Sequence, residues 1–188
     1  HITCVRPPRE EWLPAQSGFY EACRAIGYLD CTDHNLPDST GVGPLAFNAI
    51  NGTRISTATG YLTSASHRLN LTIKAGCLVH RVNIKNGRVV GLIAEAGGEL
   101  FEVLANEVIL SAGAVVSPQL LMLSGVGPAG HLSSHGVEVV ADVPGVGQNL
   151  QDHPLVFLLW ETVPDYEYQL DVRRLQISLR YTATGSNE

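Results

Sequence analysis

Apolar and polar residues alternate most regularly in the middle of the chain, which predicts β-strands there. We expect strands over Leu71–Ile73, Leu78–Ile84, Arg88–Ala96 and Leu100–Leu104. Asn86-Gly87 and Gly97-Gly98 separate the last three runs, and such pairs favour tight hairpin turns because both residues tolerate positive φ. The pattern therefore predicts an antiparallel β-meander.

A helical pattern occupies residues 9 to 26. Its apolar side chains recur at helical intervals, at Trp12, Phe19, Cys23 and Ile26. Gly27 follows the last of them and can end the helix with a positive φ. Residues 30 to 53 are rich in Asp, Asn, Pro and Gly, which predicts a long loop. Because long ordered loops are uncommon unless they are functional, we expect this loop near a site.

Shorter elements are expected in the rest of the chain. Residues 54 to 66 could form a short helix, and another is expected around His131–His135. Four further apolar runs predict strands, at Glu107–Leu110, Val137–Val140, Leu155–Thr162 and Leu175–Tyr181.

Residues 108 to 127 have the pattern of a strand, a turn of small residues and a short helix. Ser111–Ala114 are all small, so another surface can approach this backbone closely. We expect Ser117 to be the N-cap, Pro118 to take the first helical position and Gly125 to end the helix. Such an arrangement can bring backbone amides to a phosphate or a nucleotide, although it more often marks close packing alone.

Four stretches of the sequence carry a more specific signal. Residues 111–127 read SAGAVVSPQLLMLSGVG and residues 144–154 read PGVGQNLQDHP. Residues 54–71 fit the pattern R-x-S-x-x-x-x-Y-L followed by R-x-N-L, and residues 33–43 fit D-x-N followed by G-x-G. In this order they resemble the glucose–methanol–choline (GMC) family of flavin oxidoreductases, and the resemblance covers nearly the whole chain.

This resemblance implies an α/β fold of mixed α+β character that forms part of the GMC fold. Residues 71–154 would be a segment of the FAD-binding domain and would contain the antiparallel β-meander. Residues 1–70 would be substrate-domain and connecting sequence, and residues 155–188 would begin the substrate-domain sheet.

FAD is the cofactor that the resemblance implies. In the family, the valine that matches Val79 hydrogen-bonds the adenine through its backbone. The residues that match Ala112 and Gly113 pass beneath the ribose and pyrophosphate, where the requirement is absence of bulk. From the residues alone, Val79 is an ordinary strand valine.

Two elements of the family pattern are not found in the sequence. These are the Gly-x-Gly-x-x-Gly loop and the histidine-containing block beside the flavin; Gly41-Val42-Gly43 has no third glycine at the right offset. We therefore expect a middle piece of a longer enzyme, an expectation that the first residue, His1, and the last residues, Asn187-Glu188, support. No catalytic residue is assigned to this chain, and the remainder of the parent polypeptide is expected to complete the site.

The function that the resemblance implies is oxidation of a small-molecule alcohol to an aldehyde or ketone, with hydride transfer to the flavin, by the parent enzyme. The chain alone is expected to be inactive. Two alternatives stay open. One is a relative that uses its flavin for a lyase or a light-driven reaction, and the other is a non-catalytic remnant or subunit of an FAD domain.

Composition narrows the choice of partners. The chain has 188 residues, of which 45% are hydrophobic and 16% charged, as is typical of a globular protein. A net charge of −6 disfavours nucleic-acid binding. No apolar run reaches the roughly 18 residues of a membrane span, and a cytoplasmic location is favoured.

No metal site is expected. We expect reduced thiols at four positions that lack metal-type spacing, Cys4, Cys23, Cys31 and Cys77. His131 and His135 are four residues apart without a third ligand, so we interpret them as surface residues of a helix. Asn149, Asp152 and His153 are interpreted as structural hydrogen-bonding residues rather than a catalytic cluster.

Overall fold

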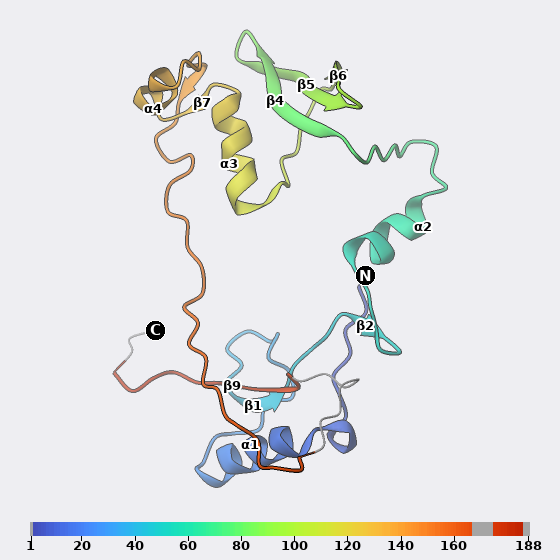
Figure 1. Ribbon diagram of the computed structural model, residues 1–188, viewed down its shortest axis with the longest axis vertical. Coiled ribbons are helices and arrows are strands. Elements are labelled where there is room, and N and C mark those ends of the chain that lie inside the picture. The colour runs from blue at the N-terminus through green and yellow to red at the C-terminus, as the bar shows by residue number, and fades with distance from the viewer. Residues whose placement is uncertain (1, 167–174, 186–188) are drawn as a thin grey trace. The chain divides into compact units, whose positions relative to one another are not determined.

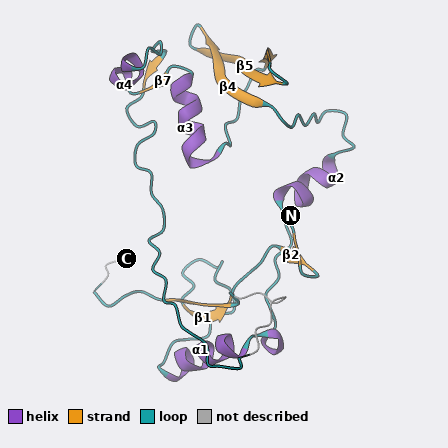
Figure 2. Cartoon of the chain, viewed as in Figure 1, coloured by secondary structure: helices purple, strands orange, loops and turns teal. Residues whose placement is uncertain are grey.

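A computed structural model describes residues 2–166 and 175–185 of the chain, with helices and strands mixed along it. Figures 1 and 2 show these elements. The chain divides into two compact units, which are described separately. The first contains residues 1–72 and 161–188, and the second contains residues 73–160. The mixture of elements confirms the predicted mixed α/β class.

The first unit begins with helical structure, as the sequence predicts. A 3-10 turn, Arg9–Glu11, precedes helix α1, Pro14–Ala25. Pro14 holds the first helical position, where its missing N–H would have no partner, and Gly27 follows the helix with φ +100°. The buried residues of α1 are Tyr20 and Cys23, whereas Phe19 is 44% exposed. The predicted apolar face is therefore confirmed at Cys23 and wrong at Phe19 and at Ile26, which is 75% exposed.

Strands β1 and β9 complete this unit. β1, Gly41–Pro44, pairs antiparallel with β9, Ile177–Arg180. Val42 and Ile177 join Tyr20 and Cys23 in one hydrophobic core. β9 confirms the strand predicted near Leu175–Tyr181.

The long loop predicted over residues 30 to 53 is wrong in part, because three short strands begin within it. Besides β1, these are β2, Ala49–Ile50, and β3, Thr53–Arg54, which pair with each other. The sequence did not predict β1, because its glycines give no alternation of apolar and polar residues. The short helix expected over residues 54 to 66 is present as a π-helix, Ala58–Leu62, followed by α2, Thr63–Ala65.

The antiparallel meander of the second unit is confirmed. It consists of β4, Leu78–Lys85, β5, Arg88–Ala96, and β6, Glu99–Leu104, in that order. Asn86 and Gly87 both have positive φ, at 52° and 72°, and so do Gly97 and Gly98, at 62° and 82°. These are the two predicted hairpin turns.

Two helices and a small parallel sheet follow the meander. Helix α3 is Gly113–Leu123 and helix α4 is Ala129–Ser134. β7, Val126–Gly127, pairs with β8, Ala141–Asp142. α4 confirms the short helix expected around His131–His135.

The predicted start of α3 is wrong. The helix begins about one turn before Ser117, with Ala112 as its N-cap, so Pro118 lies inside it. The hydroxyl of Ser117 still contacts the start of the helix, because it accepts a hydrogen bond from the N–H of Ala112 at 3.0 Å. Leu123 ends the helix and Gly125 follows with φ +83°, as expected.

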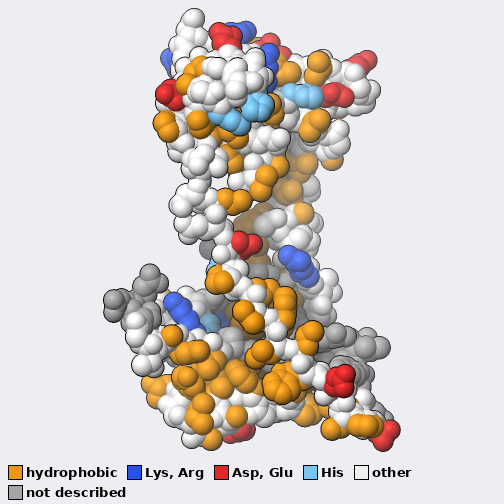
Figure 3. Space-filling view, turned by 60° about the vertical axis from the view of Figure 1, so that its left-hand side comes forward, with side chains coloured by type: hydrophobic (Ala, Val, Ile, Leu, Met, Phe, Trp, Pro, Cys, Tyr) orange, Lys and Arg blue, Asp and Glu red, His pale blue; other side chains and the backbone are white. Residues whose placement is uncertain are grey.

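Four predicted strands are wrong, although the structure describes all their residues. These are Leu71–Ile73, Glu107–Leu110, Val137–Val140 and Leu155–Thr162. A strand needs a neighbouring strand to complete its backbone hydrogen bonds, and none of these runs pairs with a strand along the described chain, although the N–H of Val140 donates to the carbonyl of Gly125. The run from Leu155 to Trp160 is strongly exposed, and Trp160 itself is 86% exposed. Figure 3 shows many hydrophobic side chains at the surface.

Candidate functional site

A hollow of about 760 Å³ lies against helix α3 in the second unit. One wall comes from α3, through Ala114, Val115, Ser117, Pro118, Leu121 and Met122. The other wall is the segment from Gly145 to Gln151. The structure thus brings together two of the four sequence stretches singled out above, residues 111–127 and 144–154.

The start of α3 is open to solvent at one edge of this hollow. Residues 111–116 are all exposed, and no side chain caps the helix. The first N–H groups of a helix have no partner within the helix and carry partial positive charge. The first turn holds no acidic residue that would repel an anion. This end of α3 can therefore accept an anionic group.

Ala112 and Gly113 lie at this exposed helix start. Ala112 has φ −89°, whereas Gly113 has φ +87°, a conformation that favours glycine. A Cβ built on Gly113 meets no atom within 4 Å. The added Cβ thus has room at Gly113, and neither Ala112 nor Gly113 lines the hollow itself.

Val79 lies outside the hollow, in strand β4. It pairs with Ala94 of β5, and the pairing shifts immediately afterwards, between Val79 and Arg81. β4 is an outer strand of the described meander, so its outer edge can offer backbone groups to other partners, although the N–H of Val82 on this strand already donates to Ser124. Beside Val79, the His80 ring lies 2.9 Å from the Glu95 carboxylate.

The polar residues near the end of the 144–154 segment form only local contacts. Asn149 accepts a hydrogen bond from Gln151, and Asp152 accepts one from the backbone N–H of His153. The side chains of Asp152 and His153 are fully exposed. The structural hydrogen bonding predicted for these residues is therefore limited to their own loop.

No metal-ligand cluster is found among the residues that the structure describes. His131 of α4 and His135, the C-cap of that helix, are both exposed, and their ring centroids lie 4.5 Å apart. All four cysteines are free, with Cys23 and Cys31 buried. Along the described chain, no helix has the length and apolar character needed to cross a membrane.

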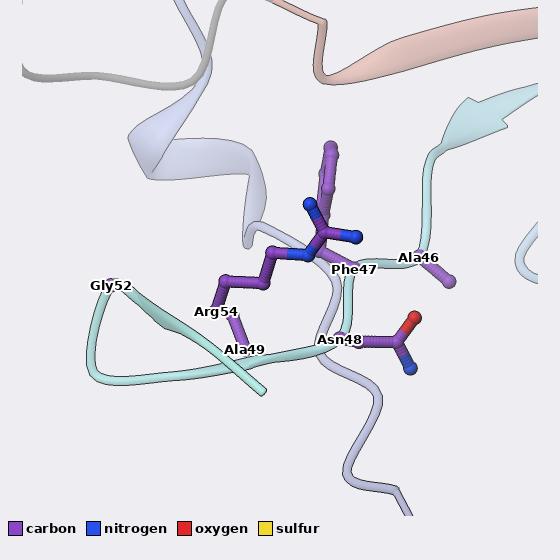
Figure 4. A pocket seen from close by; sticks show the side chains of 6 residues that line it. All are labelled: Ala46, Phe47, Asn48, Ala49, Gly52 and Arg54. Atoms are coloured by element: carbon purple, nitrogen blue, oxygen red, sulfur yellow. The ribbon is translucent and has the colours of Figure 1, made fainter. Parts of the chain in front are cut away.

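A second hollow, of about 400 Å³, lies in the first unit. Its lining consists of Ala46, Phe47, Asn48, Ala49, Gly52 and Arg54, which Figure 4 shows around the β2–β3 hairpin. Arg54 and Asn48 supply a cation and an amide, and both are exposed. In the sequence, Arg54 stands out only as part of a motif, and no pattern predicts the hollow.

Several polar contacts of the first unit are not evident from the sequence. Tyr20 donates a hydrogen bond to Asp30 at 2.8 Å, and this carboxylate raises the pKa of Tyr20, as burial also does. The backbone N–H of Asn35 lowers the pKa of Asp33, and the Arg6 guanidinium lowers it further. Tyr20 and Asp30, like Arg6 and Asp33, are too far apart in sequence for a local pattern to predict their contact. The contact between Asp33 and Asn35 is a local turn.

The chain belongs to the GMC oxidoreductase family, whose profile matches residues 4–155. This match confirms the resemblance to the family that the four sequence stretches indicate.

Named relatives agree with this family assignment. The chain is 44% identical over 148 residues to an oxygen-dependent choline dehydrogenase of Photobacterium profundum, covering 78% of this chain and 26% of the relative. It is 43% identical over 157 residues to an uncharacterized GMC-type oxidoreductase of Rhodococcus erythropolis, covering 84% and 32%.

Solved structures show the same likeness. Pyridoxine 4-oxidase from Mesorbium loti matches with a TM-score of 0.75 and 38% identity, over 79% of this chain and 29% of that one. An FAD-dependent oxidoreductase from Chaetomium thermophilum matches with a TM-score of 0.73 and 28% identity, over 80% and 26%. The chain thus spans between a quarter and a third of the length of these relatives.

Proposed function

We propose that this chain forms one wall of the FAD site in a GMC enzyme that oxidises a small-molecule alcohol to an aldehyde or ketone. The observation that carries the proposal is the open start of α3, where small residues leave the helix N-terminus accessible within a segment that matches the family. The rest of a polypeptide of the relatives' length would supply the other wall and the catalytic base.

The residues at the start of α3 fit a diphosphate group. Uncapped N–H groups and the absence of acidic side chains favour an anion there. Ala112 and Gly113 add no bulk that would keep the phosphates away from the backbone. Their role in this account is to let the anion approach the helix dipole closely.

Val79 would hold the adenine through its backbone. An adenine edge offers a donor and an acceptor, and the free edge of an outer strand such as β4 presents both kinds of group. Bound FAD would supply the hydride acceptor for the oxidation. The chain's own contribution is to bind and orient the cofactor, and we assign no proton transfer to its residues.

The substitution Ala112→Val in the full-length enzyme tests this proposal. The backbone of Ala112 accommodates a side chain, so valine adds bulk beside the phosphates without forcing the main chain. Gly113→Val also adds bulk, but at φ +87° it strains the backbone as well, so its effect would have two causes. We expect Ala112→Val to lose most of its flavin.

Ser133→Val is the matched control, because Ser133 is exposed on α4 and away from the start of α3. It should retain flavin in the same amount as the unchanged enzyme. Equal flavin absorbance per protein in Ala112→Val and in the unchanged enzyme would refute the proposed role of the α3 start.

A further inference from the structure

We propose that Ser124 is a positioning residue that holds helix α3 in place against strand β4. This inference rests on the proposed function, because these two elements carry the residues assigned to the diphosphate and to the adenine. Ser124 is the C-cap of α3, at the opposite end from Ala112 and Gly113.

The hydroxyl of Ser124 makes two hydrogen bonds in a buried position. The backbone N–H of Val82 donates to Oγ at 2.8 Å, and Oγ–H donates to the carbonyl of Leu120 at 2.5 Å. Ser124 is only 7% exposed, Val82 5% and Leu120 7%. Without this hydroxyl, the Val82 N–H would be buried without its partner, which is unfavourable.

The backbone after Ser124 anchors the same end of the helix. Gly125 has φ +83°, and a Cβ there would lie 2.4 Å from the carbonyl oxygen of Glu138. The carbonyl of Gly125 accepts hydrogen bonds from the N–H groups of Val140 and Ala141, at 2.8 and 3.1 Å. The C-terminal end of α3 is thus fixed, whereas its N-terminal end is exposed.

This arrangement makes Ser124 the link between two parts of the proposed FAD site. Val79 lies three residues before Val82 on β4, and the start of α3 lies about 16 Å along the helix from Ser124. A small rotation of α3 at Ser124 would displace its far end. A ligand that spans both elements would then bind less well, whereas a ligand that touches only β4 would not.

The test compares FAD with adenosine, which carries the adenine but no phosphate, on the full-length apoenzyme. Removal of the hydroxyl in Ser124→Ala should raise the Kd for FAD about tenfold, a change of about 1.4 kcal/mol. The Kd for adenosine should stay within about twofold of its original value, because the backbone of Val79 is unaltered. Ser124→Thr, which retains the hydroxyl, should restore FAD binding.

Ser134→Ala is the matched control, because the Ser134 hydroxyl also donates to a backbone carbonyl, that of His131, but on the exposed helix α4. It should change neither Kd. If Ser124→Ala does not fold, Ser124→Cys, with a similar shape and a weaker hydrogen-bonding group, should weaken FAD binding and leave adenosine binding unchanged.

Two results would overturn the positioning role. One is an unchanged Kd for FAD, and the other is an equal loss of FAD and adenosine binding, which would indicate general loss of structure. An unchanged full-length enzyme that binds no FAD would instead refute the proposed function, so the two failures are distinguishable.

Discussion

The backbone of Gly43 lies so close to Cys31 that a Cβ on Gly43 would be 1.7 Å from the Cys31 carbonyl oxygen. Gly43 belongs to β1, and its neighbour Val42 is fully buried in the core of the first unit. The N–H of Cys31 donates to the carbonyl of Val42 at 2.9 Å, which holds the two segments together. Only glycine fits where these backbones meet.

Gly43→Ala should therefore destabilise the first unit by roughly 3 kcal/mol or more, since the clash is with backbone that cannot rotate away. Gly18→Ala is the control, because Gly18 lies inside α1 with nothing within 4 Å of the added Cβ. It should stabilise the chain by about 0.5–1 kcal/mol, as alanine favours helix. Denaturant unfolding followed by circular dichroism measures both. Equal stability of the two variants would contradict the close packing.

Tyr20 and Asp30 give the first unit a stability that depends on pH. Tyr20 is 8% exposed and its hydroxyl donates to Asp30, so the neutral phenol is favoured and its pKa is raised. The unfolded chain releases this proton near pH 10. Stability from this contact is thus complete below pH 10 and is lost as the pH rises from there through the pKa of the folded state.

Tyr20→Phe removes the hydroxyl and should cost about 1–2 kcal/mol at neutral pH. The difference in unfolding free energy between the unchanged chain and Tyr20→Phe should shrink above pH 10. Denaturant titrations of both proteins at several pH values measure it. A difference in unfolding free energy that grows above pH 10 would contradict a raised pKa of Tyr20 in the folded state.

Local signals explain which parts of the fold could be predicted. The meander was predictable because Asn86-Gly87 and Gly97-Gly98 connect neighbouring strands by short turns. The pairing of Gly41 with Arg180 was not, because its partners are far apart in sequence and glycines give no apolar pattern. Ser117 and Pro118 correctly predicted helix α3 but not its first residue. The Ser117 hydroxyl accepts a hydrogen bond from the N–H of Ala112, although Ser117 itself lies inside the helix.

The sequence stretches that form the candidate site could be predicted, but the hollow between them could not. The stretches at residues 111–127 and 144–154 are evident in the sequence, yet their meeting around one hollow depends on tertiary packing. The contact between Ser124 and Val82 had no signal either, because it joins a helix end to a strand edge 42 residues away. The roles of Val79, Ala112 and Gly113 stay predictions.

The 188-residue chain and the full-length enzyme should differ in flavin content. The chain has one proposed wall of the cofactor site, so we expect it to bind FAD weakly or not at all and to show no alcohol oxidation. The full-length enzyme should be yellow after purification. Absorbance spectra of both purified proteins, at equal protein concentration, measure the difference. Tightly held flavin in the 188-residue chain alone would contradict the need for a second wall.

Hydrogen exchange of the full-length apoenzyme, with and without FAD, tests the central claim most directly, since it reports on the backbone N–H groups themselves. If the start of α3 binds the diphosphate, FAD should slow exchange at residues 112–117 and around Val79, while α4, Ala129–Ser134, should exchange at an unchanged rate. Bound FAD with no slowing at residues 112–117 would contradict the assignment of this chain to the cofactor site.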